Sequence, residues 1–275
     1  MIIAGVPISL RELPDLVRGW ARLRMLASDG RAVRARLNFL YFSYAPDFDC
    51  VALSLRTLAH AVPDELIGGV TLAEDQKAPF TPGQVAALRA HAPSLQVVPV
   101  RDFEWGSPRS THAELQIFRQ VCEKLPDPWD LLVKVDSDVL FIRNAKWRTL
   151  LRSNAPAIGD GHYLQHRFAQ GGLYMIRRHI VEDVLSKAGL ADVEAVAKAI
   201  DSVGEDMAIS QLLADRGRPF LFTRLMLFPD EYGPLSRLNT VVRREFLALH
   251  CHKDKPSMPM LAQRFSLLDQ PAIAT

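Results

Sequence analysis

The sequence predicts an α/β fold in which a mostly parallel mixed sheet is flanked by helices. Strand-like and helix-like segments alternate from residue 36 onward, and short connections join them. This alternation is typical of parallel sheets with right-handed crossovers and helices on both faces. Hydrophobic residues make up 48% of the 275 residues, which is enough for a large core.

The first half of the chain supplies four expected strands and the helices between them. The strands are expected at residues 38–44, 65–72, 95–100 and 131–136, and the helices at residues 51–61, 82–91 and 112–125. In the first helix, Val51, Leu55 and Leu58 fall on one stripe, as the helical period requires. The fourth strand is a mostly apolar run that ends at Asp136, which indicates a buried strand.

Two regions are distinguished by composition. Residues 1–35 are expected to form a basic helical extension, and residues 36–275 a single domain. Seven arginines occur from residue 11 to residue 36, interleaved with apolar residues, as in a basic amphipathic helix. Such a helix usually packs its apolar stripe on the protein. Peripheral contact with an anionic membrane surface is the alternative.

Overall charge and cysteine content exclude some classes of protein. The formal net charge of +2 is too small for a nucleic-acid-binding surface, so no nucleic-acid partner is expected. The three cysteines are odd in number and widely spaced, which fits a reducing compartment. Because the first residues make a poor secretory signal and no run is long enough to span a bilayer, we expect a cytoplasmic protein.

The most informative motif is Asp136-Ser137-Asp138, which directly follows the fourth strand. The carboxyl ends of strands in an open α/β sheet face the crevice where ligands bind. Two carboxylates this close repel each other unless a cation, hydrogen-bond donors or a proton offsets the repulsion. Mg2+ or Mn2+ suits these hard oxygen ligands and commonly bridges to phosphates. The alternative is a turn or helix cap, which Asp and Ser also favour.

The second half of the chain adds a glycine pair and an acidic pair. Gly171 and Gly172 precede an expected strand, where missing side chains would let a ligand approach the backbone, although a plain turn explains them equally well. Glu205 and Asp206 fall in the first turn of an expected helix, where the helix dipole favours acids without any catalytic purpose. In the functional interpretation, the dipole keeps Asp206 ionised so that it can accept a proton from a hydroxyl group.

Residues 246–255 alternate like a strand and would place His250 and His252 on one face, with Lys253 and Lys255 just beyond. An isolated histidine at a strand end is usually a surface residue. Imidazole is nevertheless an acceptable ligand for Mn2+, and lysine binds phosphate as a compact charge. The glycine signatures of common nucleotide-binding loops are missing, so a metal would have to neutralise nucleotide phosphates.

The order of these motifs resembles that of the GT-A glycosyltransferases. That family combines a Rossmann-like sheet with an Asp-x-Asp motif, a glycine loop, an x-Glu-Asp motif and a late metal-binding histidine. The match extends over residues 38–255 and comprises, in order, Asp136-Ser137-Asp138, Gly171-Gly172, Gly204-Glu205-Asp206, and His250 or His252. Each motif is weak alone, but their occurrence in this order is fairly specific. The resemblance implies a Rossmann-like GT-A fold and a GT-A-type catalytic domain over residues 36–275.

The resemblance also implies roles for individual residues. Asp138 and a late histidine, with a slight preference for His250, would coordinate Mn2+ or Mg2+, and Asp136 would contact the metal or the donor ribose. The glycine loop would border the donor sugar, and Asp206 of the x-Glu-Asp motif would act as the base or orient the acceptor. Asp75, at the end of the second strand, would lie near the nucleobase.

The implied activity is hexosyl transfer from a nucleoside diphosphate sugar, with a UDP-sugar favoured, to a saccharide, lipid-linked or other hydroxyl acceptor. Such a reaction belongs to polysaccharide biosynthesis, and inversion is slightly favoured because Asp206 is available as a base. Two alternatives remain. One is a phosphohydrolase of the haloacid dehalogenase type, which also carries Asp-x-Asp after a strand, and the other is a catalytically inactive scaffold that binds sugar nucleotides.

Overall fold

The computed structural model describes residues 36–101, 103–104, 107–124, 129–144, 146–163, 167–252 and 254–269, together with residues 2–3, 6–7, 13–14, 17–19 and 21. Most of the expected basic helix in residues 1–35 therefore lies outside the described residues, and so does Lys253. Near the start of the chain, β1 (Ile2–Ile3) and β2 (Val6–Pro7) form an antiparallel pair.

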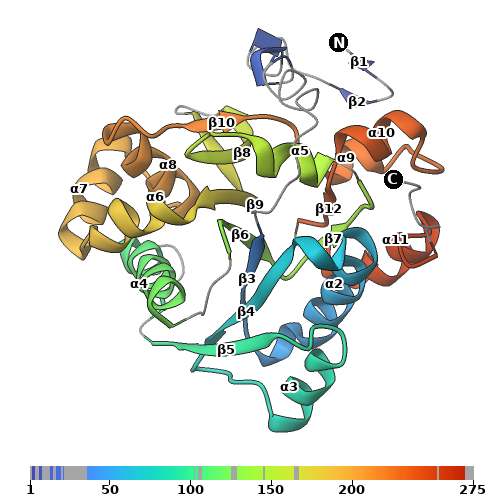
Figure 1. Ribbon diagram of the computed structural model, residues 1–275, viewed down its shortest axis with the longest axis horizontal. Coiled ribbons are helices and arrows are strands. Elements are labelled where there is room, and N and C mark those ends of the chain that lie inside the picture. Colours follow the sequence, from blue (N-terminus) through green and yellow to red (C-terminus); the bar gives the residue numbers. More distant parts are fainter. Residues whose placement is uncertain are drawn as a thin grey trace.

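A mixed, mostly parallel sheet forms the centre of the described part of the chain (Figure 1), with strand order β10-β8-β9-β6-β3-β4-β5. Its strands are β3 (Leu37–Ser43), β4 (Ile67–Asp75), β5 (Leu95–Val100), β6 (Leu131–Asp136), β8 (Ala157–Tyr163), β9 (Arg167–Arg177) and β10 (Phe220–Phe222). All pairings are parallel except those that β9 makes with β6 and β8. The predicted α/β fold is confirmed.

Helices cover both faces of this sheet, as the strand-helix alternation predicts (Figure 1). One face packs on α2 (Phe48–Ala61), α3 (Pro82–Arg89) and α5 (Lys146–Arg152), and the other on α4 (Pro108–Lys124), α6 (Arg178–Asp183), α7 (Leu190–Ile200) and α8 (Glu205–Asp215). Successive strand residues point to opposite faces, so Phe39 and Tyr41 join the first core cluster and Leu40 the second. Burial on both faces explains why the central strands are almost wholly apolar.

A smaller sheet, in the order β11-β12-β7, extends the structure beside the end of β6. It consists of β7 (Val139–Phe141), β11 (Met226–Leu227) and β12 (Ala248–His250), and its apolar side packs on α9 (Pro229–Tyr232), α10 (Thr240–Glu245) and α11 (Met258–Arg264). Four 3-10 helices lie in described connections: η1 (Ala45–Asp47), η2 (Asp64–Leu66), η3 (Leu185–Lys187) and η4 (Lys255–Ser257). In the antiparallel pairing of β12 with β7, His250 lies opposite Val139, next to the Asp-x-Asp turn.

Two expected elements are wrong in extent. Gly171 and Gly172 lie inside β9 rather than before a strand. They immediately precede Leu173, the first residue of β9 that pairs with β6, and lie near a register shift in the pairing of β9 with β8. The strand expected over residues 246–255 ends at His250, because β7 offers no further partner. His252 then adopts a positive φ of 41° in a turn, so strand alternation does not place it, although its ring lies beside that of His250 and both line the same pocket.

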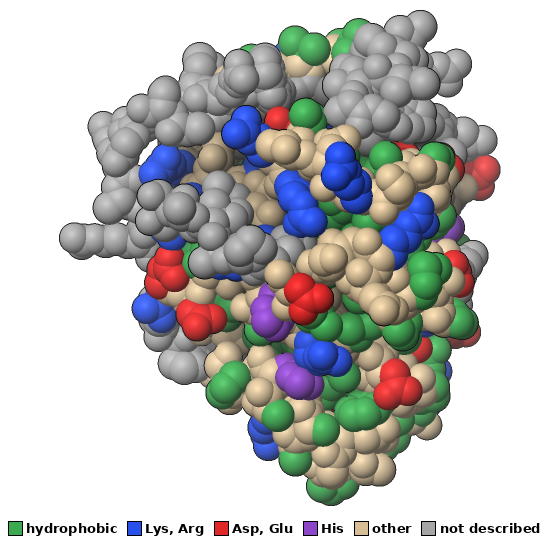
Figure 2. Space-filling view, turned by 90° about the vertical axis from the view of Figure 1, so that its right-hand side faces the viewer, with side chains coloured by type: hydrophobic (Ala, Val, Ile, Leu, Met, Phe, Trp, Pro, Cys, Tyr) green, Lys and Arg blue, Asp and Glu red, His purple; other side chains and the backbone are tan. Residues whose placement is uncertain are grey.

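No helix within the described ranges is long and apolar enough to cross a membrane. Figure 2 shows the face on the right of Figure 1, where α10 and α11 lie. On this face the lysine and arginine side chains lie in separate patches between neutral and apolar side chains.

Candidate active site

The Asp-x-Asp motif lies at the point where the chain leaves the main sheet. Residues 131–135 of β6 are buried, and Asp136 is the first residue of the strand that emerges from the core. Asp138 follows in a turn that leads directly into β7. The backbone carbonyl of Asp138 accepts a hydrogen bond of 2.9 Å from the amide of Cys251, so the turn is tied to the chain just after β12.

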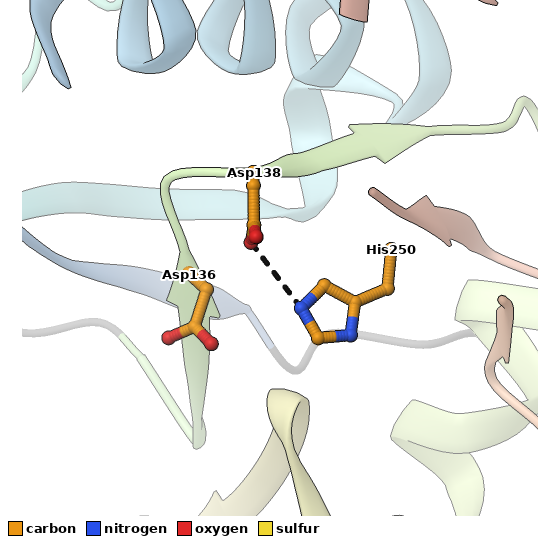
Figure 3. Close-up of side chains that lie close together, drawn as sticks. All are labelled: Asp136, Asp138 and His250. Atoms are coloured by element: carbon orange, nitrogen blue, oxygen red, sulfur yellow. Dashed lines mark ion pairs between the residues drawn. The ribbon is translucent and has the colours of Figure 1, made fainter. Parts of the chain in front are cut away.

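This connection brings His250 to the two aspartates (Figure 3). The Nε2 atom of His250 lies 3.2 Å from Oδ1 of Asp138, and both side chains are buried. One ligand atom from each of Asp136, Asp138 and His250 can be chosen so that all three lie within 4.8 Å of one another. Ligands that surround one Mg2+ or Mn2+ at about 2.1 Å are separated by roughly 3 to 4 Å. Two carboxylates and one imidazole at this spacing therefore fit a single divalent ion.

His252 lies outside this metal-ligand cluster. Its side chain is exposed, and its ring stacks edge-to-face on the ring of His250 with 5.6 Å between the ring centroids. Of the two histidines, His250 is therefore the one that the geometry places beside the aspartates, while His252 lines the opening of the same pocket.

The glycine pair separates the metal-ligand cluster from the acidic pair at the start of α8. A Cβ atom on Gly172 would lie 2.8 Å from Nδ1 of His250, which is too close for any side chain. The amide of Gly171 donates a hydrogen bond of 3.1 Å to Oδ2 of Asp206. The close approach of His250 explains the need for glycine at position 172, whereas a Cβ atom on Gly171 would meet Asp206 at an ordinary contact distance of 3.4 Å.

Asp206 lies in the first turn of α8, as predicted, and its Oδ1 accepts a hydrogen bond of 2.8 Å from the amide of Met207. Burial, and then the charge of Glu205, raise its pKa to about 6, although Lys134 and the two backbone donors oppose the shift. Burial therefore outweighs the stabilising effect expected at a helix N-terminus. At neutral pH most of the carboxylate is still ionised, so Asp206 can accept a proton.

Lys134 is a buried cation below this site that the sequence analysis missed. Its Nζ donates to Oδ1 of Asp136 at 2.5 Å and to the carbonyl of Gly171 at 2.6 Å. Burial alone would lower its pKa, but the carboxylates of Asp136, Glu114 and Glu205 raise it, so Lys134 is charged. The signal available in the sequence was a lysine inside an otherwise apolar strand.

Asp47 is a second residue that was missed. It lies in η1, just after the carboxyl end of β3, and one of its oxygens, Oδ2, accepts hydrogen bonds of 2.6 Å from both Ser137 Oγ and Lys255 Nζ. Asp47 therefore connects the end of β3 with the Asp-x-Asp turn and with η4. Its position after a parallel strand is the same kind of position that drew attention to Asp75.

These groups surround one pocket with a volume of about 340 Å3. It is lined by ten of the residues predicted from the sequence, Asp75, Asp136, Asp138, Gly171, Gly172, Glu205, Asp206, His250, His252 and Lys255. The lining residues that were not predicted include Asp47, Ser137, Gln170 and, on the side of β5, Val100 and Phe103. Parallel strands ending at the same edge of the sheet explain why motifs so far apart in sequence meet here.

Comparison with known proteins identifies the architecture. The fold is similar to that in the crystal structure of an active-site mutant of LgtC, with a TM-score of 0.54 and 15% sequence identity, over 85% of this chain and 97% of the LgtC chain. The chain has the GT-A fold. No protein-family model and no curated protein sequence matches the chain. At 15% identity the likeness to LgtC establishes the fold alone.

Proposed function

We propose that this protein is a metal-dependent glycosyltransferase that moves a sugar from a nucleoside diphosphate sugar to an acceptor hydroxyl. The observation that carries the proposal is that one pocket holds both a cluster of potential metal ligands and a half-buried carboxylate with a pKa of about 6. The likeness in fold to LgtC, a GT-A glycosyltransferase, supports the same class of reaction.

The donor would bind at the Asp-x-Asp side of the pocket. Asp136, Asp138 and His250 would hold Mn2+ or Mg2+, and a bound divalent ion neutralises charge on the leaving diphosphate. Lys255 would add a second cation, since its ammonium group lies at the pocket wall. Asp75 ends β4 at the same edge and would contact the nucleoside, for which uridine is favoured.

The acceptor would bind on the side of α8. Asp206 would take the proton from the acceptor hydroxyl as oxygen attacks the sugar, and a pKa of about 6 keeps a base both ionised and reasonably basic at neutral pH. Glu205 contributes to that pKa through its neighbouring charge. A carboxylate base of this kind fits an inverting reaction with a saccharide or lipid-linked hydroxyl, in the cytoplasm or at the inner face of a membrane.

The first test is calorimetric binding of UDP with and without Mn2+, on the wild type, Asp138→Ala and the control Asp215→Ala. Asp215 is an exposed acid at the far end of α8, outside the pocket. We expect tight binding only with Mn2+, its loss in Asp138→Ala and its retention in the control. If neither UDP nor any other nucleotide binds with metal, the proposal is overturned, and assays for phosphatase activity come next.

For an active enzyme, the anomeric configuration of the product, read by NMR, tests inversion. A product of retained configuration would remove the role of Asp206 as base and leave the transferase proposal standing.

A further inference from the structure

Lys134 lies in the middle of β6, beneath the pocket rather than on its wall. Its side chain is only 4% exposed, and the pocket is lined by the residues around it but not by Lys134 itself. A ligand in the pocket would therefore not touch this lysine. Whatever Lys134 contributes must act through the groups that it binds.

Those groups belong to both halves of the site. The ammonium group donates to Oδ1 of Asp136, one of the potential metal ligands, and to the carbonyl of Gly171. The amide of the same Gly171 donates to Oδ2 of Asp206. A continuous hydrogen-bonded path therefore runs from Asp136 through Lys134 and one glycine to Asp206.

The position of Lys134 is energetically unfavourable for a residue that only fills space. Its neighbours in β6 are buried apolar residues, and replacing a buried ion pair with apolar side chains is often neutral or stabilising. The surroundings accommodate the charge of Lys134. Its Nζ lies 5.8 Å from the centroid of the Tyr174 ring. The hydroxyl of Tyr174 in turn donates a hydrogen bond of 2.5 Å to the buried Glu114. The fold thus maintains a cation directly below the two functional groups.

We propose that Lys134 is a positioning residue that aligns the metal-binding and proton-accepting halves of the site. It holds Oδ1 of Asp136 and so fixes the orientation of a carboxylate that would bind a divalent ion. It also holds the backbone of Gly171, and thereby the hydrogen bond that orients Asp206. This inference rests on the proposed function, because it assigns Lys134 a role in the same site.

The test compares Lys134→Met with Lys146→Met. Methionine has a similar length without charge, and Lys146 is the control because it is a half-buried lysine whose ammonium group donates to the carbonyls of Arg224 and Glu245, away from the pocket. The readouts are the affinity for UDP with Mn2+, the Mn2+ concentration that gives half-maximal binding, and the unfolding midpoint.

We expect Lys134→Met to weaken Mn2+-dependent UDP binding by at least about tenfold and to raise the Mn2+ requirement, as loss of a partner of a metal ligand commonly does. Lys146→Met is expected to lower the unfolding midpoint while leaving the Mn2+ requirement unchanged. If Lys134→Met does not fold, Lys134→Gln, which keeps one donor group, takes its place in the same comparison.

The outcomes separate the two proposals. If the wild type fails to bind any nucleotide with Mn2+, the proposed function itself is lost. If the wild type binds but a folded Lys134 variant shows the same affinity and Mn2+ requirement, the positioning role is overturned and the transferase proposal remains.

Discussion

Gly172 lies so close to the ring of His250 that a side chain at this position would have to displace it. A Cβ atom there would be 2.8 Å from Nδ1, 2.9 Å from Cε1 and 3.0 Å from Cγ of His250. The ring is buried and its Nε2 faces Asp138, so it cannot retreat without leaving that aspartate. The glycine in β9 therefore determines where the imidazole in β12 can lie.

Gly172→Ala should weaken Mn2+-dependent UDP binding by about tenfold or more, because the displaced imidazole no longer reaches the ion in the right geometry. Calorimetry at fixed Mn2+ measures the effect. Gly83→Ala is the control, since a Cβ at this position in α3 meets no atom closer than 4.0 Å. Unchanged binding in Gly172→Ala would show that His250 is not a ligand.

Transfer activity should fall on the acid side of a pH near 6. Burial and Glu205 raise the pKa of Asp206 to about 6, so its basic form is lost below that pH and kcat/KM should drop about tenfold for each further pH unit. A pH–rate profile measures this, with Mn2+-dependent UDP binding followed over the same range to separate loss of the base from loss of the metal. A profile that is flat from pH 5 to pH 7 would contradict the assignment of Asp206 as base.

The wild type should lose stability as the pH rises from 5 to 8, partly because of Glu114. Burial raises the pKa of Glu114 from 4.5 to about 8, so folding favours its protonated form and the stabilisation is lost as the pH rises through 8. In the Glu114→Gln variant, whose side chain stays neutral, the free energy of unfolding measured with urea should fall less over this pH range. Glu123→Gln, an exposed acid on the same helix, is expected to behave like the wild type.

Asp47 and Lys255 should be energetically coupled. The ion pair of 2.6 Å joins η1 to η4, and the aspartate side chain is nearly buried while the lysine is one third exposed. Asp47→Ala should destabilise the protein more than Lys255→Met does, because it leaves Lys255 and Ser137 without their shared acceptor. In urea unfolding, the double mutant should show a coupling of roughly 1–2 kcal/mol. Purely additive effects would mean that the pair contributes nothing to holding η4.

Local features of the sequence were sufficient to predict β3, β4, β5, β6 and a strand within β9, but not β8 or β10. An apolar run that ends in Asp136 can be recognised as a buried strand, and acids just after Gly204 can be recognised as a first helical turn, because both patterns involve only neighbouring residues. Asp75 was assigned to the same site as Asp136 only through the resemblance to the GT-A glycosyltransferases, and both residues line the pocket because parallel strands end at a common edge.

Only the tertiary structure decided which groups face each other within the pocket. His250 rather than His252 meets Asp138 because β12 ends opposite Val139, the first residue of β7, and the extent of that pairing depends on residues more than 100 positions apart. The same holds for Asp47 with Lys255, and for Lys134, whose second partner is supplied by the antiparallel strand β9. Sequence patterns report which face of an element is apolar, whereas long-range contacts of buried polar groups depend on how the elements pack.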